Sequence, residues 1–173
     1  MDGNQRNIFG LYQKHKDSKL TFNEIQDIKS QIMLIEADMN RFAFNDGRGI
    51  GFDDDTGIIS INKAVFKEQS EVLPEYRLSI RGILAHEYWG HLMNHPSPHE
   101  PNTPEDECWA DDSAARRSPG LTAEDKTILF RRALKYAQIA REQFPLGESA
   151  FEYKVDDLVR RYLSDDEICK LSE

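Results

Sequence analysis

The sequence predicts an α+β fold that is mostly helical, with a small antiparallel β-hairpin ahead of a metal-binding helix. Three observations lead to this fold class: several segments repeat apolar residues every three or four positions, one short β-branched segment follows an Asp- and Gly-rich turn, and a helical segment carries the motif HEYWGH. The chain has 173 residues, of which 39% are hydrophobic, enough to bury one core. We therefore expect one domain over residues 1–173, with residues 1–19 as a loosely ordered N-terminal segment.

The first predicted element is a long amphipathic helix over residues 21–44. Its apolar residues recur at alternating steps of three and four, the spacing that places side chains on one face of a helix. These residues are Ile25, Ile28, Ile32, Ile35, Met39 and Phe42. The segment Asn45-Asp46-Gly47 then ends the element.

A β-hairpin is predicted next, in the sequence GIGFDDDTGIISIN. Its first arm ends at Phe52, Asp54 to Gly57 form the turn, and Ile58 to Ile61 form a β-branched second arm. The run Asp53-Asp54-Asp55 lacks the spaced ligands of a calcium loop, so we interpret it as a solvated turn.

Four further helical regions complete the predicted fold. The first covers roughly residues 75–95 and carries HEYWGH; the second covers about 104–117, with Pro104 in its first turn. A long helix follows from Thr122 to about residue 143, and one or two helices close the chain. The residues of the long helix expected to face inward are Ile128, Leu129, Ala133, Leu134, Ala137 and Ala140.

The motif HEYWGH, residues 86–91, resembles the zinc-peptidase motif H-E-x-x-H but contains one extra residue. On an ideal α-helix, residues five apart are separated by about 140°, so His86 and His91 would not share a face. A π-bulge would widen this turn and rotate both imidazoles to one side, and such bulges are frequent at functional sites. Gly90 within the motif tolerates unusual backbone angles and leaves room for a neighbouring element.

A third metal ligand is available on the next predicted helix. Glu107 and Asp111 lie four residues apart and therefore share a face. In this arrangement Glu107 binds the metal, and Asp111 accepts a hydrogen bond from the outer N–H of a ligand histidine. Ala110 and Ala114 keep that face small, so that the two helices could approach closely.

These residues suit hydrolysis assisted by a zinc ion, Zn2+. Such a site needs three protein ligands, one open position for water, and a nearby carboxylate that takes the water proton without binding the metal. His86, His91 and Glu107 supply the ligands, and Glu87 supplies the base. A group is also needed to stabilise the oxyanion, and the sequence leaves this choice open among Tyr153, Tyr136, His95, His99, Arg116 and Arg117.

Two short motifs resemble a known family. HEYWGH matches the HExxGH signature of the dipeptidyl peptidase III family of zinc exopeptidases, and residues 106–111, DECWAD, resemble its second motif, E-E-C-x-A-E. The resemblance implies His86, His91 and Glu107 as ligands, Glu87 as the base and Asp111 as a supporting residue. Members of that family are several times longer and two-lobed, so the resemblance implies a similar site rather than dipeptide release.

The order of elements is also similar to that of small gluzincin-type peptidases, in which a hairpin precedes the motif helix and a glutamate helix follows. This likeness implies a zincin-like peptidase domain that binds extended peptide along an edge strand. Residues 58–62 would be that strand here.

Three other interpretations remain open at this point. Glu87, His91 and His95 lie four residues apart on one regular helical stripe, so His91 and His95 could bind zinc without a bulge. A non-catalytic, zinc-stabilised binding module would keep the ligands without needing Glu87 as a base. A di-iron protein could use the same carboxylates, although its usual Glu-x-x-His pairs are missing.

Charge and composition limit the partners. The formal net charge is -9, and the paired arginines 116–117, 131–132 and 160–161 are expected on solvated helix faces, so we expect no nucleic-acid partner. No apolar run approaches the length of a membrane span, so we expect no membrane partner. The predicted peptidase site implies a protein or peptide substrate. The N-terminal sequence lacks the apolar stretch of a signal peptide, which indicates a cytoplasmic protein or an effector exported by a signal-free route.

Overall fold

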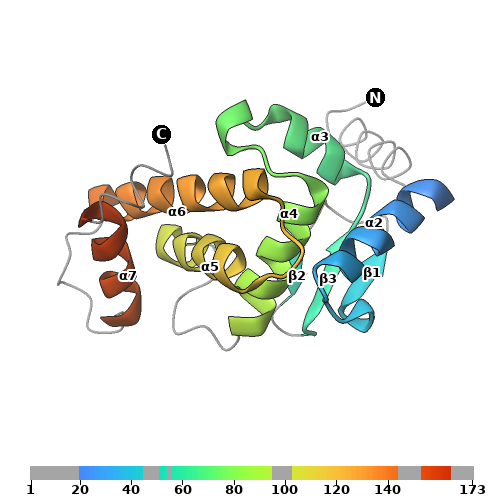
Figure 1. Ribbon diagram of the computed structural model, residues 1–173, viewed down its shortest axis with the longest axis horizontal. Helices are drawn as coiled ribbons and strands as arrows, with labels where there is room; N and C mark the ends of the chain where they lie inside the picture. Colours follow the sequence, from blue (N-terminus) through green and yellow to red (C-terminus); the bar gives the residue numbers. More distant parts are fainter. Residues whose placement is uncertain (1–19, 45–50, 54–55, 95–102, 144–152, 165–173) are drawn as a thin grey trace, which may run out of the picture.

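The computed structural model describes residues 20–44, 51–53, 56–94, 103–143 and 153–164. They form an α+β fold that is mostly helical, with a small sheet and α2 on one side and α5, α6 and α7 on the other (Figure 1). The motif helix lies between these two parts. The α-helices are α2 (Phe22–Leu34), α3 (Ala64–Glu71), α4 (Ile80–Ala85), α5 (Pro104–Arg117), α6 (Ala123–Gln143) and α7 (Tyr153–Ser164).

Helix α2 is shorter than the sequence predicted. It begins with a capping box, in which Thr21 and Glu24 each bind the other's backbone N–H, and it buries Ile28 and Ile32. The predicted helix over residues 21–44 is wrong beyond Leu34, because Glu36 adopts a left-handed φ of 53° and the chain then turns through η1 (Met39–Arg41). Residues 42–44 become a strand instead.

The sheet has three strands in the order β1-β3-β2: β1 (Phe42–Phe44), β2 (Gly51–Asp53) and β3 (Ile58–Ile61). Strand β2 pairs antiparallel with β3, with Phe52 opposite Ile59. Strand β1 pairs parallel with β3, with Phe42 opposite the same Ile59. The sheet is therefore mixed, and the prediction of an antiparallel sheet holds only for the β2–β3 pair.

This strand order corrects one functional expectation. Strand β3 lies in the centre of the sheet, and its backbone is paired on both sides. A strand paired on both sides cannot add a peptide by main-chain hydrogen bonding. Residues 58–62 are therefore not the substrate-binding edge, and the outer strands β1 and β2 carry the edges of the described sheet.

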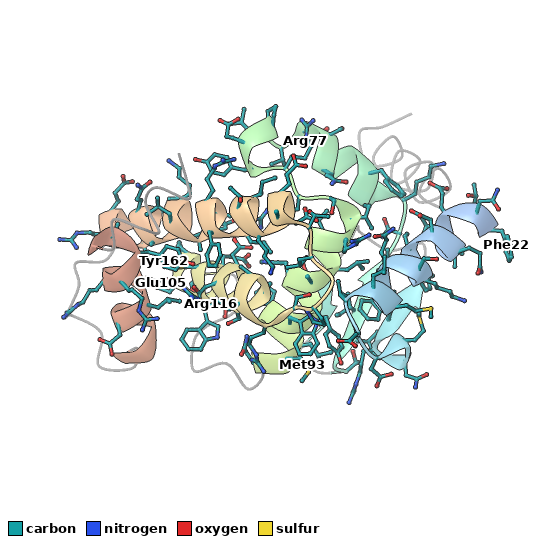
Figure 2. All side chains as sticks on the ribbon, in the orientation of Figure 1. Phe22, Arg77, Met93, Glu105, Arg116 and Tyr162 are labelled. Carbon is teal, nitrogen blue, oxygen red and sulfur yellow. The ribbon has the colours of Figure 1, made fainter. Side chains whose placement is uncertain are left out.

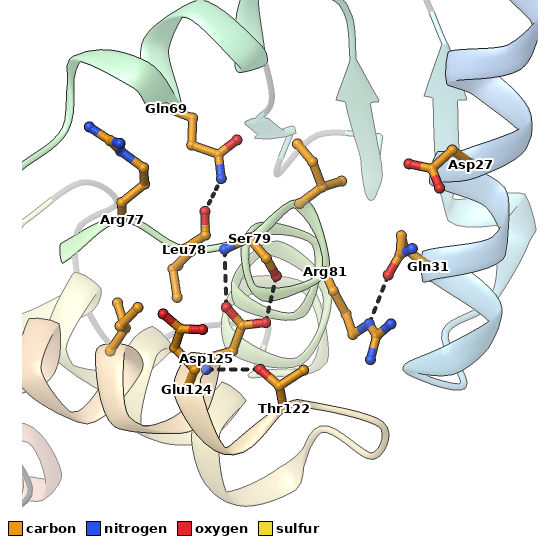
Figure 3. Close-up of a pocket in the computed structure, with 12 residues that line it drawn as sticks. Asp27, Gln31, Gln69, Arg77, Leu78, Ser79, Arg81, Thr122, Glu124 and Asp125 are labelled. Carbon is orange, nitrogen blue, oxygen red and sulfur yellow. Dashed lines mark hydrogen bonds between the residues drawn. The ribbon is translucent and has the colours of Figure 1, made fainter. Parts of the chain in front are cut away.

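The motif helix begins at Ile80 rather than near residue 75. Residues Pro74–Tyr76 form a separate 3₁₀ turn, η2, and the helix then continues from α4 through η3 (His86–His91) and η4 (Leu92–Asn94). Ser79 caps α4 by accepting the N–H of Gly82. Buried Asp125 from the start of α6 accepts hydrogen bonds from both the N–H and the hydroxyl of Ser79 (Figure 3). This contact fixes the start of the motif helix against α6.

Helices α5 and α6 have the predicted bounds to within a residue. Thr103 caps α5 and Pro104 occupies its first position, while the hydroxyl of Thr122 accepts the N–H of Asp125 at the start of α6. Five of the six α6 residues expected to face inward are buried, and Leu134 is partly buried. Tyr162 of α7 donates its hydroxyl to Asp112 of α5 at 2.7 Å, which docks α7 beside α5 and α6 (Figure 2). Within the described ranges, no helix combines the length and apolar character needed to cross a membrane.

Candidate metal centre

The segment His86–His91 forms a π-helix, as the extra residue predicted. The N–H of Leu92 donates to the carbonyl of Glu87, five residues earlier, which is the widened hydrogen-bonding pattern of a π turn. As a result His86 and His91 face the same way: their Nε2 atoms lie 3.1 Å apart, and their ring centroids are separated by 4.7 Å. In the alternative pairing of His91 with His95, His95 lies outside the described residues; within them, the turn from Glu87 to His91 is π rather than regular α-helix.

Gly90 allows helix α5 to reach this π turn. A Cβ atom at this position would lie 2.6 Å from the carbonyl oxygen of Ala110, so no larger residue fits without backbone movement. Ala110 and Ala114 are both fully buried at this contact. The predicted small face of α5 is confirmed, and it places Glu107 above the two histidines.

The other face of the π-helix is fixed to the sheet side of the molecule. The ring of Tyr88 stacks on Phe42 of β1 with centroids 5.9 Å apart. The indole Nε1 of Trp89 donates to the carbonyl of Ile35 at 2.9 Å. Both aromatic residues therefore pack against the core and orient the helix.

Ligand atoms of three side chains lie close together, within 4.8 Å of one another. Glu107 Oε2 lies 3.2 Å from His86 Nε2, and Glu107 Oε1 lies 3.4 Å from His91 Nε2. Tetrahedral ligands about 2.0–2.1 Å from a zinc ion are separated from one another by about 3.3 Å. The distances among His86, His91 and Glu107 match this spacing, so these three side chains could hold a metal ion.

Each histidine is also oriented by a second carboxylate from α5. Asp111 Oδ1 lies 2.7 Å from His86 Nδ1, and Asp111 is fully buried. Asp106 Oδ2 lies 3.4 Å from His91 Nδ1. A carboxylate at the outer ring nitrogen leaves Nε2 to face the metal, which is the usual arrangement for ligand histidines. Asp111 was predicted for this role, whereas Asp106 was not.

The electrostatics of the metal-free site favour protonated imidazoles beside an ionised Glu107. Burial lowers the pKa of His86, but the charge and hydrogen bond of Asp111 outweigh burial and raise this pKa well above its usual value. Burial likewise lowers the pKa of His91, and the hydrogen bond to Glu107 reverses this effect. Burial raises the pKa of Glu107, yet its contacts with the two histidines bring it well below its normal range. A metal ion would take the place of the protons that these groups share.

A cavity of about 250 Å³ lies beside two of the three candidate ligand residues, His86 and Glu107. His86, Glu87 and Glu107 line one part of it, so the predicted base and two predicted ligands face the same space. The remaining described lining residues come from the α3–η2 region, from the start of the motif helix and from α6: Gln69, Val72, Tyr76, Arg77, Leu78, Ile83 and Arg132. The site is therefore open on the side of Glu87, where a water molecule or a substrate group could approach the metal.

Arg132 is the main residue of this site that sequence reasoning missed. It was assigned to a solvated helix face, but its side chain is only 19% exposed, and its Nε lies 3.2 Å from Asp111 Oδ2. A signal was present in the sequence: Arg132 lies four residues after Ile128 and three after Leu129, on the apolar stripe of α6. A charged residue on such a stripe indicates a buried partner.

The other candidates for the oxyanion role lie elsewhere or outside the described residues. Arg116 is bound to Asp112, and Arg117 donates to Asn94. Burial raises the pKa of Tyr136, which packs between α5, α6 and α7 and is not among the described cavity-lining residues. His95 and His99 lie outside the described residues, as does the side chain of Tyr153 at the start of α7.

A second, larger hollow of about 460 Å³ lies next to this cavity and shares Gln69, Arg77 and Leu78 with it (Figure 3). Most of its polar groups are bound to one another. Gln69 donates to the carbonyl of Leu78, and Arg81 donates to Gln31. We interpret this hollow as the junction at which α2, α4 and α6 are fastened together.

Comparison of the chain with protein-family models, with curated proteins and with solved structures gave no match.

Proposed function

We propose that this protein is a zinc-dependent peptidase that uses Glu87 as its general base. The observation that carries the proposal is the grouping of His86, His91 and Glu107, whose ligand atoms lie within 4.8 Å of one another, beside a cavity that Glu87 also lines. Two neutral imidazoles and one carboxylate form the ligand set of a hydrolytic zinc site with one open position. A purely structural zinc site is usually closed by four protein ligands, so the open side favours catalysis over a binding module.

The residues divide the reaction between them. Zinc held by His86, His91 and Glu107 would lower the pKa of a bound water to about 7 and polarise the substrate carbonyl. Glu87 takes the proton of the attacking water and later delivers it to the departing amine. Asp111 and Asp106 hold the two imidazoles in the tautomer that presents Nε2 to the metal.

The substrate in this proposal is a peptide whose scissile carbonyl enters the cavity beside Glu87. Because β3 is paired on both sides, the peptide backbone is bound by the α3–η2 wall of the cavity or by an outer strand. The cavity, at about 250 Å³, is slightly smaller than the usual range of ligand pockets, about 300–1,000 Å³. This size suits one or two substrate residues.

The variant Glu87→Gln tests the assignment. It keeps the shape of the side chain but removes the base, so we expect zinc content to stay at one ion per chain while peptide hydrolysis falls by about 100-fold or more. The measurement is mass-spectrometric profiling of cleaved peptides in a peptide library, together with metal analysis of the purified protein.

Two matched variants complete the test. Glu107→Gln should lose both zinc and hydrolysis, and Glu105→Gln, a neighbour outside the ligand set, should keep both. Equal hydrolysis by the parent and Glu87→Gln would exclude Glu87 as the base. Bound zinc without any peptide cleavage by the parent would support the non-catalytic binding module instead.

A further inference from the structure

Arg132 carries a feature that the metal site itself does not explain. Its Nε binds both oxygens of Asp111, at 3.3 and 3.2 Å. An arginine side chain has five N–H donors, and this contact uses only the one on Nε. Among the residues that the structure describes, the two terminal nitrogens of Arg132 have no hydrogen-bond partner.

Leaving these donors unused is costly at this position. The side chain of Arg132 is only 19% exposed, and a buried donor without a partner costs free energy. Arg132 also lines the cavity that contains Glu87 and Glu107. The position of its guanidinium is fixed by Asp111, which is bound in turn to His86. The free donors therefore belong to a rigid group at the edge of the site.

We infer that Arg132 binds a carboxylate of the substrate, and this inference rests on the proposed peptidase function. A guanidinium with two free terminal nitrogens matches a carboxylate, because two parallel N–H bonds can form at once. Arg132 and Leu78 are at the wall of a small cavity, so the carboxylate would belong to a residue close to the scissile bond. The substrate is then a peptide with either a free C-terminus or an acidic side chain near the cleaved bond.

The charges around the cavity support an arginine that is held for this purpose. Asp111 contacts both Arg132 and His86. Its single negative charge therefore only partly neutralises the positive charge of the guanidinium when the imidazole is also charged or bound to a cation. Among the described lining residues of the cavity, the other acidic and basic side chains besides His86 are Glu87, Glu107 and Arg77. Of the two cations, Arg77 donates through one terminal nitrogen to the carbonyls of Ser70 and Val72. Arg132 is thus the cation that lies beside the metal ligands.

The experiment measures binding, so that it does not depend on turnover. Zinc-loaded protein carrying Glu87→Gln is titrated by calorimetry with three N-acetylated dipeptides: one with a free C-terminal carboxylate, its C-terminal amide, and an amide that carries a glutamate side chain. We expect at least one of the two carboxylate peptides to bind roughly 10- to 100-fold more tightly than the plain amide. Whichever carboxylate peptide binds more tightly identifies the source of the carboxylate.

The variant Arg132→Gln should abolish this preference. Its matched control is Arg131→Gln, which removes the same charge from the adjacent residue; Arg131 contacts the carbonyl of Glu75 and is not a described cavity-lining residue. The control should keep the full preference. Zinc content and the unfolding temperature are measured for both variants, and Arg132→Lys tests whether charge alone restores binding when the planar two-donor geometry is missing.

The outcomes separate this inference from the proposed function. A carboxylate preference that survives in Arg132→Gln would mean that the metal binds the carboxylate directly, and would overturn the role of Arg132. Equal binding of all three peptides by the zinc-loaded Glu87→Gln protein with Arg132 intact would overturn it as well. Peptide hydrolysis without any carboxylate preference refutes only the inference about Arg132. A preference that depends on Arg132, in a protein that cleaves no peptide, refutes the peptidase and keeps the carboxylate site.

Discussion

At the scale of single residues, the candidate site depends on carboxylates that do not touch the metal position. Asp111 is fully buried and lies 2.7 Å from Nδ1 of His86, so it determines which ring nitrogen faces Glu107. Arg132 contacts Asp111 from the other side, with its Nε 3.2 Å from Asp111 Oδ2. The order Arg132–Asp111–His86 therefore connects α6, α5 and the π-helix through one row of charged groups.

The variant Asp111→Asn should weaken zinc binding by about 10- to 100-fold, the usual effect of removing such a supporting group. The amide keeps the shape of the side chain, but it lacks the negative charge that strengthens the hydrogen bond to Nδ1 of His86. Competition with a zinc-binding dye measures the change in affinity.

Asp112→Asn is the matched control for this prediction. Asp112 is the next residue on α5, but its carboxylate accepts hydrogen bonds from Tyr162 and Arg116. We expect this control to lower the unfolding temperature while zinc affinity stays within a factor of two to three of the parent. If both variants lose zinc equally, Asp111 has no special role in orienting His86.

Most residues of the candidate site could be predicted at this scale because their spacing is local. His86, Glu87 and His91 lie within six residues, and Glu107 and Asp111 lie within one turn of the next helix. Arg132 could not be found in this way, because its partner Asp111 lies on another helix, 21 residues earlier in the chain. Only the interruption of an apolar stripe indicated it.

At the scale of elements, the contact between the π-helix and α5 determines whether the three ligand atoms meet. The backbones approach so closely at Gly90 that a Cβ atom would lie 2.6 Å from the Ala110 oxygen and 3.0 Å from its carbonyl carbon. A widened turn and a glycine thus occur together, and each serves the same purpose: the turn aims the histidines, and the glycine admits the helix that carries Glu107.

Gly90→Ala should therefore destabilise the protein, although alanine favours helices by about 1 kcal/mol over glycine at an open position. Overpacking at a tight contact costs about 1–3 kcal/mol. We expect a lower free energy of unfolding in urea and weaker zinc binding, because α5 must move away from the histidines. An unchanged or higher stability with normal zinc affinity would show that the two elements are not in this close contact.

The sheet shows why some elements could not be predicted. Met39 and Phe42 continue the helical spacing of α2, so local periodicity favours one helix over residues 21–44. The structure ends this helix at Leu34 because residues 42–44 pair with residues of β3 that lie 17 positions later in the sequence. Local periodicity contains no information about a strand partner that far along the chain. Helices α5 and α6 carry their own capping residues, so their bounds could be predicted closely.

At the scale of the whole molecule, the two halves of the fold contact opposite faces of the motif helix, one through apolar residues and the other through charged residues. The sheet and α2 hold the apolar face of the motif helix through Tyr88 and Trp89. Helices α5 and α6 supply the charged residues on its other face, and α7 is docked behind them by Tyr162. The candidate metal ligands are thus supported by both halves, so we expect metal binding and folding to depend on each other.

This coupling predicts how pH changes the stabilisation by zinc. In the metal-free protein the pKa of His86 and that of His91 are both raised. Their protonated forms therefore stabilise the fold fully below the pKa of an unfolded histidine, about 6.5, and this contribution is lost as the pH rises through the higher folded pKa. The lowered pKa of Glu107 affects stability only at acidic pH: the ionised carboxylate stabilises the fold at higher pH, and this contribution is lost as the pH falls through the low folded pKa.

Zinc requires both imidazoles to be neutral, so it competes with the protons that the metal-free site retains. We expect the increase in unfolding temperature caused by zinc to grow from pH 5.5 to pH 8, with zinc affinity rising by roughly a hundredfold per pH unit where both histidines would otherwise be protonated. Differential scanning calorimetry with and without zinc, in buffers that do not bind metal, measures this dependence. His86→Ala should show little zinc stabilisation at any pH, because it lacks a ligand. A zinc effect that is constant across this range in the parent would mean that the metal does not displace protons from His86 and His91, and the ligand assignment would then be wrong.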